Sequence, residues 1–113
     1  MNRGPAAEAL AARFLSERGL DVVARNYRCR GGEIDLIARD GATLVFVEVR
    51  LRSNRAFGGA AESITATKRR RLRLAAGRYL ADLELEPPCR FDAILLDALA
   101  LGNIEWLRGI DVD

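Results

Sequence analysis

Two neighbouring segments, 33–39 and 43–50, alternate apolar and polar residues with the period of a β-strand, and they constrain the fold more than any other part of the chain. Asp40-Gly41-Ala42 between them is typical of a hairpin turn. One face of this predicted hairpin is apolar and must be buried, because otherwise a broad aliphatic surface would contact water. That face carries Ile34, Leu36, Ala38, Val45, Val47 and Val49.

The second face of the predicted hairpin gathers acidic residues. Glu33 and Asp35 share it with Glu48 and Arg50 of the partner strand. If residues 41 and 42 form the loop, Asp35 lies opposite Glu48; if the loop begins one residue earlier, Glu33 does. Opposed Cβ atoms lie about 4.5–5.5 Å apart, where like charges are destabilising. We therefore expect a cation between the carboxylates, either a divalent ion with a preference for oxygen ligands or a nearby arginine in an ordinary surface ion cluster.

The rest of the chain follows a regular order of predicted elements. Helical periodicity predicts helices over 5–18 and 66–83, the second capped by Thr65 or Thr67. Strands are predicted over 20–28, 90–97 and 104–107, with a loop over 53–59. The order α-β-β-β-α-β predicts one α/β domain over residues 1–113, with a mixed sheet flanked by helices and a crossover helix between parallel strands. We expect Asp92 to be a structural hydrogen-bond acceptor.

Positive charge is concentrated in one block of the sequence. Residues 49–81 hold nine basic side chains against one acidic side chain, whereas residues 82–113 hold two basic and eight acidic ones. A phosphate backbone suits such a block, and Lys68 begins a helix whose N-terminus favours anions. Alternatively, the acidic C-terminal part balances the block, or the block binds an acidic protein partner. The nucleic-acid-binding candidates are Arg52, Lys68, Arg69, Arg70 and Arg73.

Two absences exclude several kinds of chemistry. The chain has no histidine, which excludes histidine-based catalysis and histidine zinc sites. It has only two cysteines, too few for a thiolate metal cluster within one chain. No apolar run reaches the ~18 residues that span a bilayer, and the N-terminal residues do not read as a secretory signal. We therefore expect a cytoplasmic protein without a membrane partner.

Several motifs in a fixed order resemble a known family. Gly-Glu-Ile-Asp-Leu-Ile-Ala-Arg (32–39), Val-Phe-Val-Glu-Val-Arg (45–50), the arginine-rich helix and Arg-Phe-Asp (90–92) resemble the YraN family of small bacterial proteins. This family is placed in the PD-(D/E)xK nuclease superfamily. The resemblance implies a restriction-endonuclease-like fold close to archaeal Holliday-junction resolvases. It also implies hydrolysis of DNA phosphodiester bonds with Mg²⁺ or Mn²⁺, with branched duplex DNA as a candidate substrate. Related resolvases act as dimers, so a homodimer is open, although no residue identifies a dimer face.

The resemblance also assigns roles to individual residues. Asp35 matches the metal-binding aspartate, Glu48 matches the first acid of (D/E)xK, and Glu8 matches an acid that resolvases supply from their first helix. Glu33, beside Asp35, is a further candidate metal ligand. Arg50 stands at the position of the motif lysine, and arginine stays protonated, so it can orient water but cannot accept a proton. Two interpretations follow: a tolerated substitution in a chain with 17 arginines and one lysine, or a catalytically impaired nucleic-acid-binding module.

Overall fold

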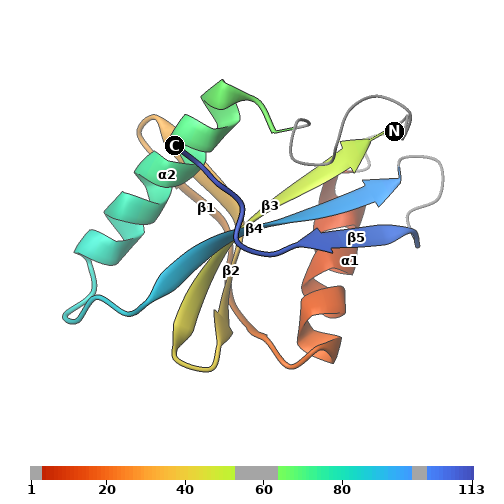
Figure 1. Ribbon diagram of the computed structural model, residues 1–113, viewed down its shortest axis with the longest axis horizontal. Helices are drawn as coiled ribbons and strands as arrows, with labels where there is room; N and C mark the ends of the chain where they lie inside the picture. Colours follow the sequence, from red (N-terminus) through yellow and green to blue (C-terminus); the bar gives the residue numbers. More distant parts are fainter. Residues whose placement is uncertain (1–3, 53–63, 98–101) are drawn as a thin grey trace.

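The computed structural model describes residues 4–52, 64–97 and 102–113. Its elements are α1 (Gly4–Glu17), β1 (Asp21–Cys29), β2 (Gly32–Asp40), β3 (Thr43–Arg52), α2 (Ala66–Ala81), β4 (Cys89–Asp97) and β5 (Ile104–Leu107) (Figure 1). This order confirms the predicted αβββαβ core and the short last strand. The loop predicted over 53–59 lies outside the described residues. Neither described helix is both long and apolar enough to cross a membrane.

One five-stranded sheet, in the order β1-β2-β3-β4-β5, forms the centre of the molecule. β1, β2 and β3 pair antiparallel, β3 and β4 pair parallel, and β5 returns antiparallel to β4. The predicted mixed sheet with a helical crossover is therefore confirmed. In the hairpin, Asp40 pairs with Thr43, so the loop is Gly41–Ala42. Gly41 has φ 60°, a left-handed conformation that glycine adopts without strain. This register puts Asp35 next to Glu48.

The two helices cover opposite faces of the sheet (Figure 1). α1 buries small residues such as Ala7 and Ala11 against aliphatic side chains of β2, β3 and β4. α2 buries Leu72, Ala75 and Ala76 against the other face, which includes the fully buried Phe46. Both faces of the hairpin near its turn are therefore in the core.

α2 approaches the start of β2 so closely that only glycine fits there. A Cβ atom on Gly32 would lie 2.6 Å from the carbonyl oxygen of Arg71 and 2.9 Å from the backbone nitrogen of Ala75. Real Cβ atoms do not approach backbone atoms so closely. Gly32 thus fixes how near α2 lies to the two strands that carry the acidic residues.

The prediction that Ile34 shares the apolar face of Leu36 and Ala38 is wrong. Ile34 packs beneath α2 in the same cluster as Phe46, whereas Leu36 and Ala38 pack beneath α1. The pairing of β2 with β3 ends at Leu36. Beyond it, the Asp35 side chain rather than a strand carbonyl accepts the N–H of the facing strand. Regular alternation therefore does not extend from residue 36 back to residue 34.

α2 begins as predicted but ends earlier than predicted. The Thr65 side chain accepts a hydrogen bond from the backbone N–H of Lys68 at 3.2 Å, which makes Thr65 the N-cap. The helix ends at Ala81, not at residue 83. Leu83, the last residue of the predicted helix, is 37% exposed. At the other end of the helix, Lys68 in the first turn lies 3.9 Å from Glu48 of β3.

Asp92 is fully buried and confirms the structural role predicted for it. Its carboxylate accepts hydrogen bonds from Arg90 Nε at 3.1 Å, Trp106 Nε1 at 3.0 Å and the Gly109 backbone N–H at 2.9 Å. These donors come from β4, β5 and the segment after β5, so one carboxylate ties the C-terminal part of the chain to the sheet.

Candidate functional site

The hairpin register and a side-chain contact bring Asp35 and Glu48 together. Asp35 Oδ2 accepts a hydrogen bond from the Val49 backbone N–H at 2.8 Å, which fixes the orientation of its carboxylate. Glu48 is 8% exposed, and its carboxyl group shares a side-chain hydrogen bond with Asp35. We call these two side chains the acid pair. The acid pair lies on the face of the sheet that α2 covers, because Glu48 also meets Lys68 of α2.

The surroundings of the acid pair favour the protonated form of Glu48. Burial raises the pKa of Glu48 from 4.5 to about 9, and the hydrogen bond and negative charge of Asp35 add to this effect. The positive charges of Lys68 and Arg50 oppose the rise in pKa but do not cancel it. A cation with affinity for carboxylate oxygens can therefore replace the proton that Glu48 carries.

Two cationic side chains act on the acid pair. Lys68 Nζ lies 3.9 Å from Glu48 Oε2, with 43% of the lysine side chain exposed. Arg50 comes two residues after Glu48 in β3, and its buried Nε has no hydrogen-bond partner within the described residues. Sequence reasoning assigned Lys68 to phosphate binding and missed this contact with Glu48. Two features of the sequence could have drawn attention to Lys68: it is the chain's only lysine, and it follows the N-cap by three residues.

The expected convergence of three or four carboxylates does not occur in the described part of the chain. There, no group of three or more Asp, Glu or Cys residues lies close enough to hold a metal ion. Glu33 instead lies between two guanidinium groups, 3.9 Å from Arg28 and 3.9 Å from Arg71. Glu8 belongs to α1, which packs on the face opposite to α2. The centre therefore offers two carboxylates, which suits Mg²⁺, because this ion keeps several waters and needs only one or two carboxylates.

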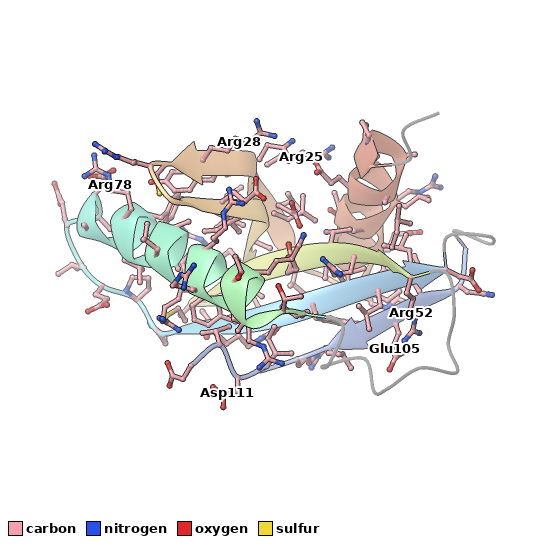
Figure 2. The ribbon with its side chains drawn as sticks, turned by 90° about the horizontal axis from the view of Figure 1, so that it is seen from above. Arg25, Arg28, Arg52, Arg78, Glu105 and Asp111 are labelled. Carbon is pink, nitrogen blue, oxygen red and sulfur yellow. The ribbon has the colours of Figure 1, made fainter. Side chains whose placement is uncertain are left out.

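Arg52 and Arg73, two of the four arginines predicted to bind nucleic acid, contact other parts of the protein. Arg52 Nη2 lies 2.7 Å from Glu105 Oε1 and joins β3 to β5 (Figure 2). Arg73 Nη1 donates to the Val112 carbonyl oxygen at 2.5 Å. Together with Asp113, these C-terminal contacts favour the alternative in which the acidic end balances part of the basic block. Arg69, Arg70 and Arg73 line a depression of about 250 Å³ with Ala66, Val112 and Asp113.

Fold and site define an α/β protein in which a strand hairpin and the first turn of a crossover helix enclose a carboxylate pair. Residues 7–96 match the uncharacterised protein family UPF0102, so the chain belongs to this family. This confirms the resemblance to the YraN family.

Similar proteins occur in several bacteria. A UPF0102 protein of Nitrosospira multiformis is 57% identical over 106 residues, covering 94% of this chain and 89% of the relative. One from Nitrosomonas europaea is 54% identical over 107 residues, covering 95% and 91%. One from Cupriavidus necator is 56% identical over 108 residues, covering 94% and 79%. The names of these relatives give no activity.

Proposed function

We propose that this protein is a metal-dependent nuclease of the PD-(D/E)xK superfamily that hydrolyses phosphodiester bonds in DNA. The observation that carries the proposal is the contact between Asp35 and Glu48 with Lys68 Nζ only 3.9 Å from Glu48. Two adjacent carboxylates provide hard oxygen ligands, and the neighbouring ammonium group favours an anionic substrate. The restriction-endonuclease-like expectation agrees with the αβββαβ order of the elements.

The acid pair fits a divalent cation. Both groups are oxygen donors, and their proximity is unfavourable unless a proton or a cation lies between them. Asp35 is already oriented by the Val49 N–H, so it needs no rearrangement to present its second oxygen. Mg²⁺ or Mn²⁺ bound there would supply Lewis acidity and lower the pKa of a bound water. No third protein carboxylate is needed, because water and phosphate oxygens complete the coordination of Mg²⁺.

Arg50 and Lys68 would contribute differently to phosphodiester hydrolysis at the acid pair. Arg50 remains protonated, so it contributes positive charge and hydrogen bonds to a phosphoryl oxygen. Lys68 contributes a compact ammonium group from a separate element, α2, at 3.9 Å from Glu48. Both place positive charge where negative charge grows in the transition state of phosphodiester hydrolysis, and such fixed charge is the main way in which proteins stabilise it.

The test is a cleavage assay with labelled duplex, nicked and four-way-junction DNA, in Mg²⁺, Mn²⁺ or EDTA. We expect metal-dependent cleavage that Asp35→Asn and Glu48→Gln abolish. Glu86→Gln, an exposed position outside the acid pair, is the matched control and should cleave normally. Calorimetric titration with Mn²⁺ should show binding to the wild type and to Glu86→Gln, and none to Asp35→Asn. Cleavage that persists in EDTA or in Asp35→Asn contradicts the proposal.

Arg50 and the two-carboxylate centre favour a second candidate, a nucleic-acid-binding module that has lost catalysis. This candidate predicts salt-sensitive DNA binding without cleavage, both in the wild type and in Arg50→Lys. Cleavage gained by Arg50→Lys would instead indicate a degenerate nuclease. If the wild type neither cleaves nor binds DNA, both candidates fail, and the basic block is better explained by an acidic protein partner.

A further inference from the structure

The basic residues of α2 lie on two flanks with different surroundings. Lys68 lies beside Glu48 of β3, Arg71 lies beside Glu33 of β2, and Arg78 lines a depression with residues of β1. We call these three residues, with Arg28 in β1 and Arg30 just after it, the strand-side flank. Arg69, Arg70 and Arg73 face the C-terminal segment, and we call them the tail-side flank. The spacing i, i+3, i+10 of the first group and i, i+1, i+4 of the second agrees with two separate sides of one helix.

The strand-side flank is a row of basic side chains that begins at the acid pair and contains the carboxylate of Glu33 between Arg71 and Arg28. Lys68 lies next to Glu48, and Arg71 and Arg28 follow, each 3.9 Å from Glu33. Side chains remain accessible there, since 47% of Arg71 and 74% of Arg28 are exposed. The row ends at an open depression of about 460 Å³ between the end of β1 and the end of α2. Tyr27, Arg28, Cys29, Arg30, Leu74, Arg78 and Asp82 line this depression.

The tail-side flank, in contrast, is contacted by the C-terminal segment, although Arg70 and Arg73 themselves remain exposed. Val112 is 7% exposed and packs in the cluster beneath α2, and its carbonyl accepts the Arg73 hydrogen bond. Asp113 lies in the same depression as Arg69, Arg70 and Arg73. In Figure 2, Arg25 and Arg28 lie on one side of α2 and Asp111 lies on the other. An incoming phosphate would therefore compete with the C-terminal segment on the tail side and, on the strand side, with the Glu33 carboxylate at 3.9 Å from Arg28 and Arg71.

We propose that the phosphate backbone of duplex DNA lies along the strand-side flank, from the acid pair to the depression at Arg28, Arg30 and Arg78. This inference rests on the proposed function, because that function places a DNA phosphate at the acid pair. Ten residues of helix separate Lys68 from Arg78, a rise of about 15 Å. This is the axial length of about four base pairs of DNA. The flank is therefore long enough to contact several successive phosphates, and it replaces Arg69, Arg70 and Arg73 as the nucleic-acid-binding surface.

Two double variants that remove equal charge from the same helix test this inference. Arg71→Gln/Arg78→Gln alters the strand-side flank, and Arg70→Gln/Arg73→Gln alters the tail-side flank. Binding of fluorescent duplex DNA is measured by anisotropy in EDTA, over about 50 to 200 mM salt. We expect the strand-side variant to bind about tenfold more weakly, with the slope of log K against log salt reduced by about two. The tail-side variant should stay within about twofold of the wild type.

Equal losses in both variants would mean that only net charge matters, and would overturn the inference. A larger loss in the tail-side variant would also overturn it. Melting curves check folding, and if loss of the Arg73–Val112 contact unfolds the tail-side variant, Arg71→Gln against Arg70→Gln gives the same comparison. Absence of DNA binding by the wild type overturns the inference as well. If the strand-side variant binds DNA more weakly as expected but the wild type shows no metal-dependent cleavage, the nuclease proposal is contradicted and this inference is not. If the wild type cleaves DNA but neither double variant binds it more weakly, this inference alone is contradicted.

Discussion

Glu48→Gln should stabilise the metal-free protein at neutral pH while abolishing the metal site. In the native state Glu48 holds its proton up to a pKa of about 9, whereas in the unfolded state it ionises near its ordinary value of 4.5. Between these two values the native state binds more protons than the unfolded state. The Glu48 contribution therefore lowers stability as pH rises through this range, and the loss is complete once pH exceeds the native pKa. Glutamine keeps the shape and a hydrogen-bond donor toward Asp35, and it has no proton to lose.

The size of the effect follows from the same two values. At about 1.4 kcal/mol per pH unit, the interval from 4.5 to pH 7 corresponds to about 3 kcal/mol of lost stability in the wild type. Glu48→Gln avoids this loss. The difference between variant and wild type should thus be small at pH 4.5 and should grow to about 3 kcal/mol at pH 7.

Urea unfolding in EDTA, followed by circular dichroism at several pH values between 4.5 and 9, measures the difference. Glu86→Gln makes the same chemical change at an exposed position and should shift stability little. A Glu48→Gln advantage that stays constant or shrinks with rising pH would refute the reasoning, because it would mean that native Glu48 is ionised at neutral pH.

Three further predictions follow from the geometry. Mn²⁺ affinity of the wild type, measured by calorimetry, should rise with pH toward about 9, because the metal must displace the Glu48 proton. Gly32→Ala should destabilise by about 1–3 kcal/mol in urea unfolding, since its Cβ would meet backbone atoms of Arg71 and Ala75; unchanged stability would show that α2 shifts freely. Asp92→Asn should lower stability by about 3 kcal/mol, because a buried carboxylate with three donors loses its charge; a loss below about 1 kcal/mol would contradict this role.

The order of the elements could be predicted because the signals for it are local. The alternation in β2 and β3, the Gly41 turn and the Thr65 cap each depend on residues within a few positions of one another. The exception is Ile34, which packs beneath α2 although the alternation places it with Leu36 beneath α1. The pairing of β2 with β3 ends at Leu36, and strand periodicity does not indicate where such pairing ends.

The hairpin pattern reduced the acid pair to two alternatives, with Asp35 or Glu33 opposite Glu48, and the observed register selects Asp35. The surroundings of the acid pair could not be predicted from the hairpin. Glu33 follows the same alternation as Asp35, yet it forms ion pairs with Arg28 and Arg71. Arg71 comes from a helix that is separated from the hairpin in sequence, so its position depends on how closely Gly32 lets α2 approach.

The distribution of basic residues along the sequence likewise differs from their distribution over the surface of the folded protein. The block at residues 49–81 looks uniform in the sequence, but α2 turns its arginines to two flanks, and the C-terminal residues contact one of them. The C-terminal segment contacts the tail-side flank, and Glu33 lies beside Arg28 and Arg71 of the strand-side flank.

The arginine at position 50 is weaker evidence of lost catalysis in the structure than in the sequence. The (D/E)xK motif has a lysine two residues after the acidic residue, because a strand then places both side chains on one face. Stabilising the transition state of phosphodiester hydrolysis requires only that a cation lie beside the carboxylates, whichever element supplies it. Here α2 brings the chain's one lysine to 3.9 Å from Glu48, while the charge of Arg50 acts on the same carboxylate from β3. The acid pair therefore has two cations beside it, and the departure from the motif at position 50 does not leave the site without an ammonium group.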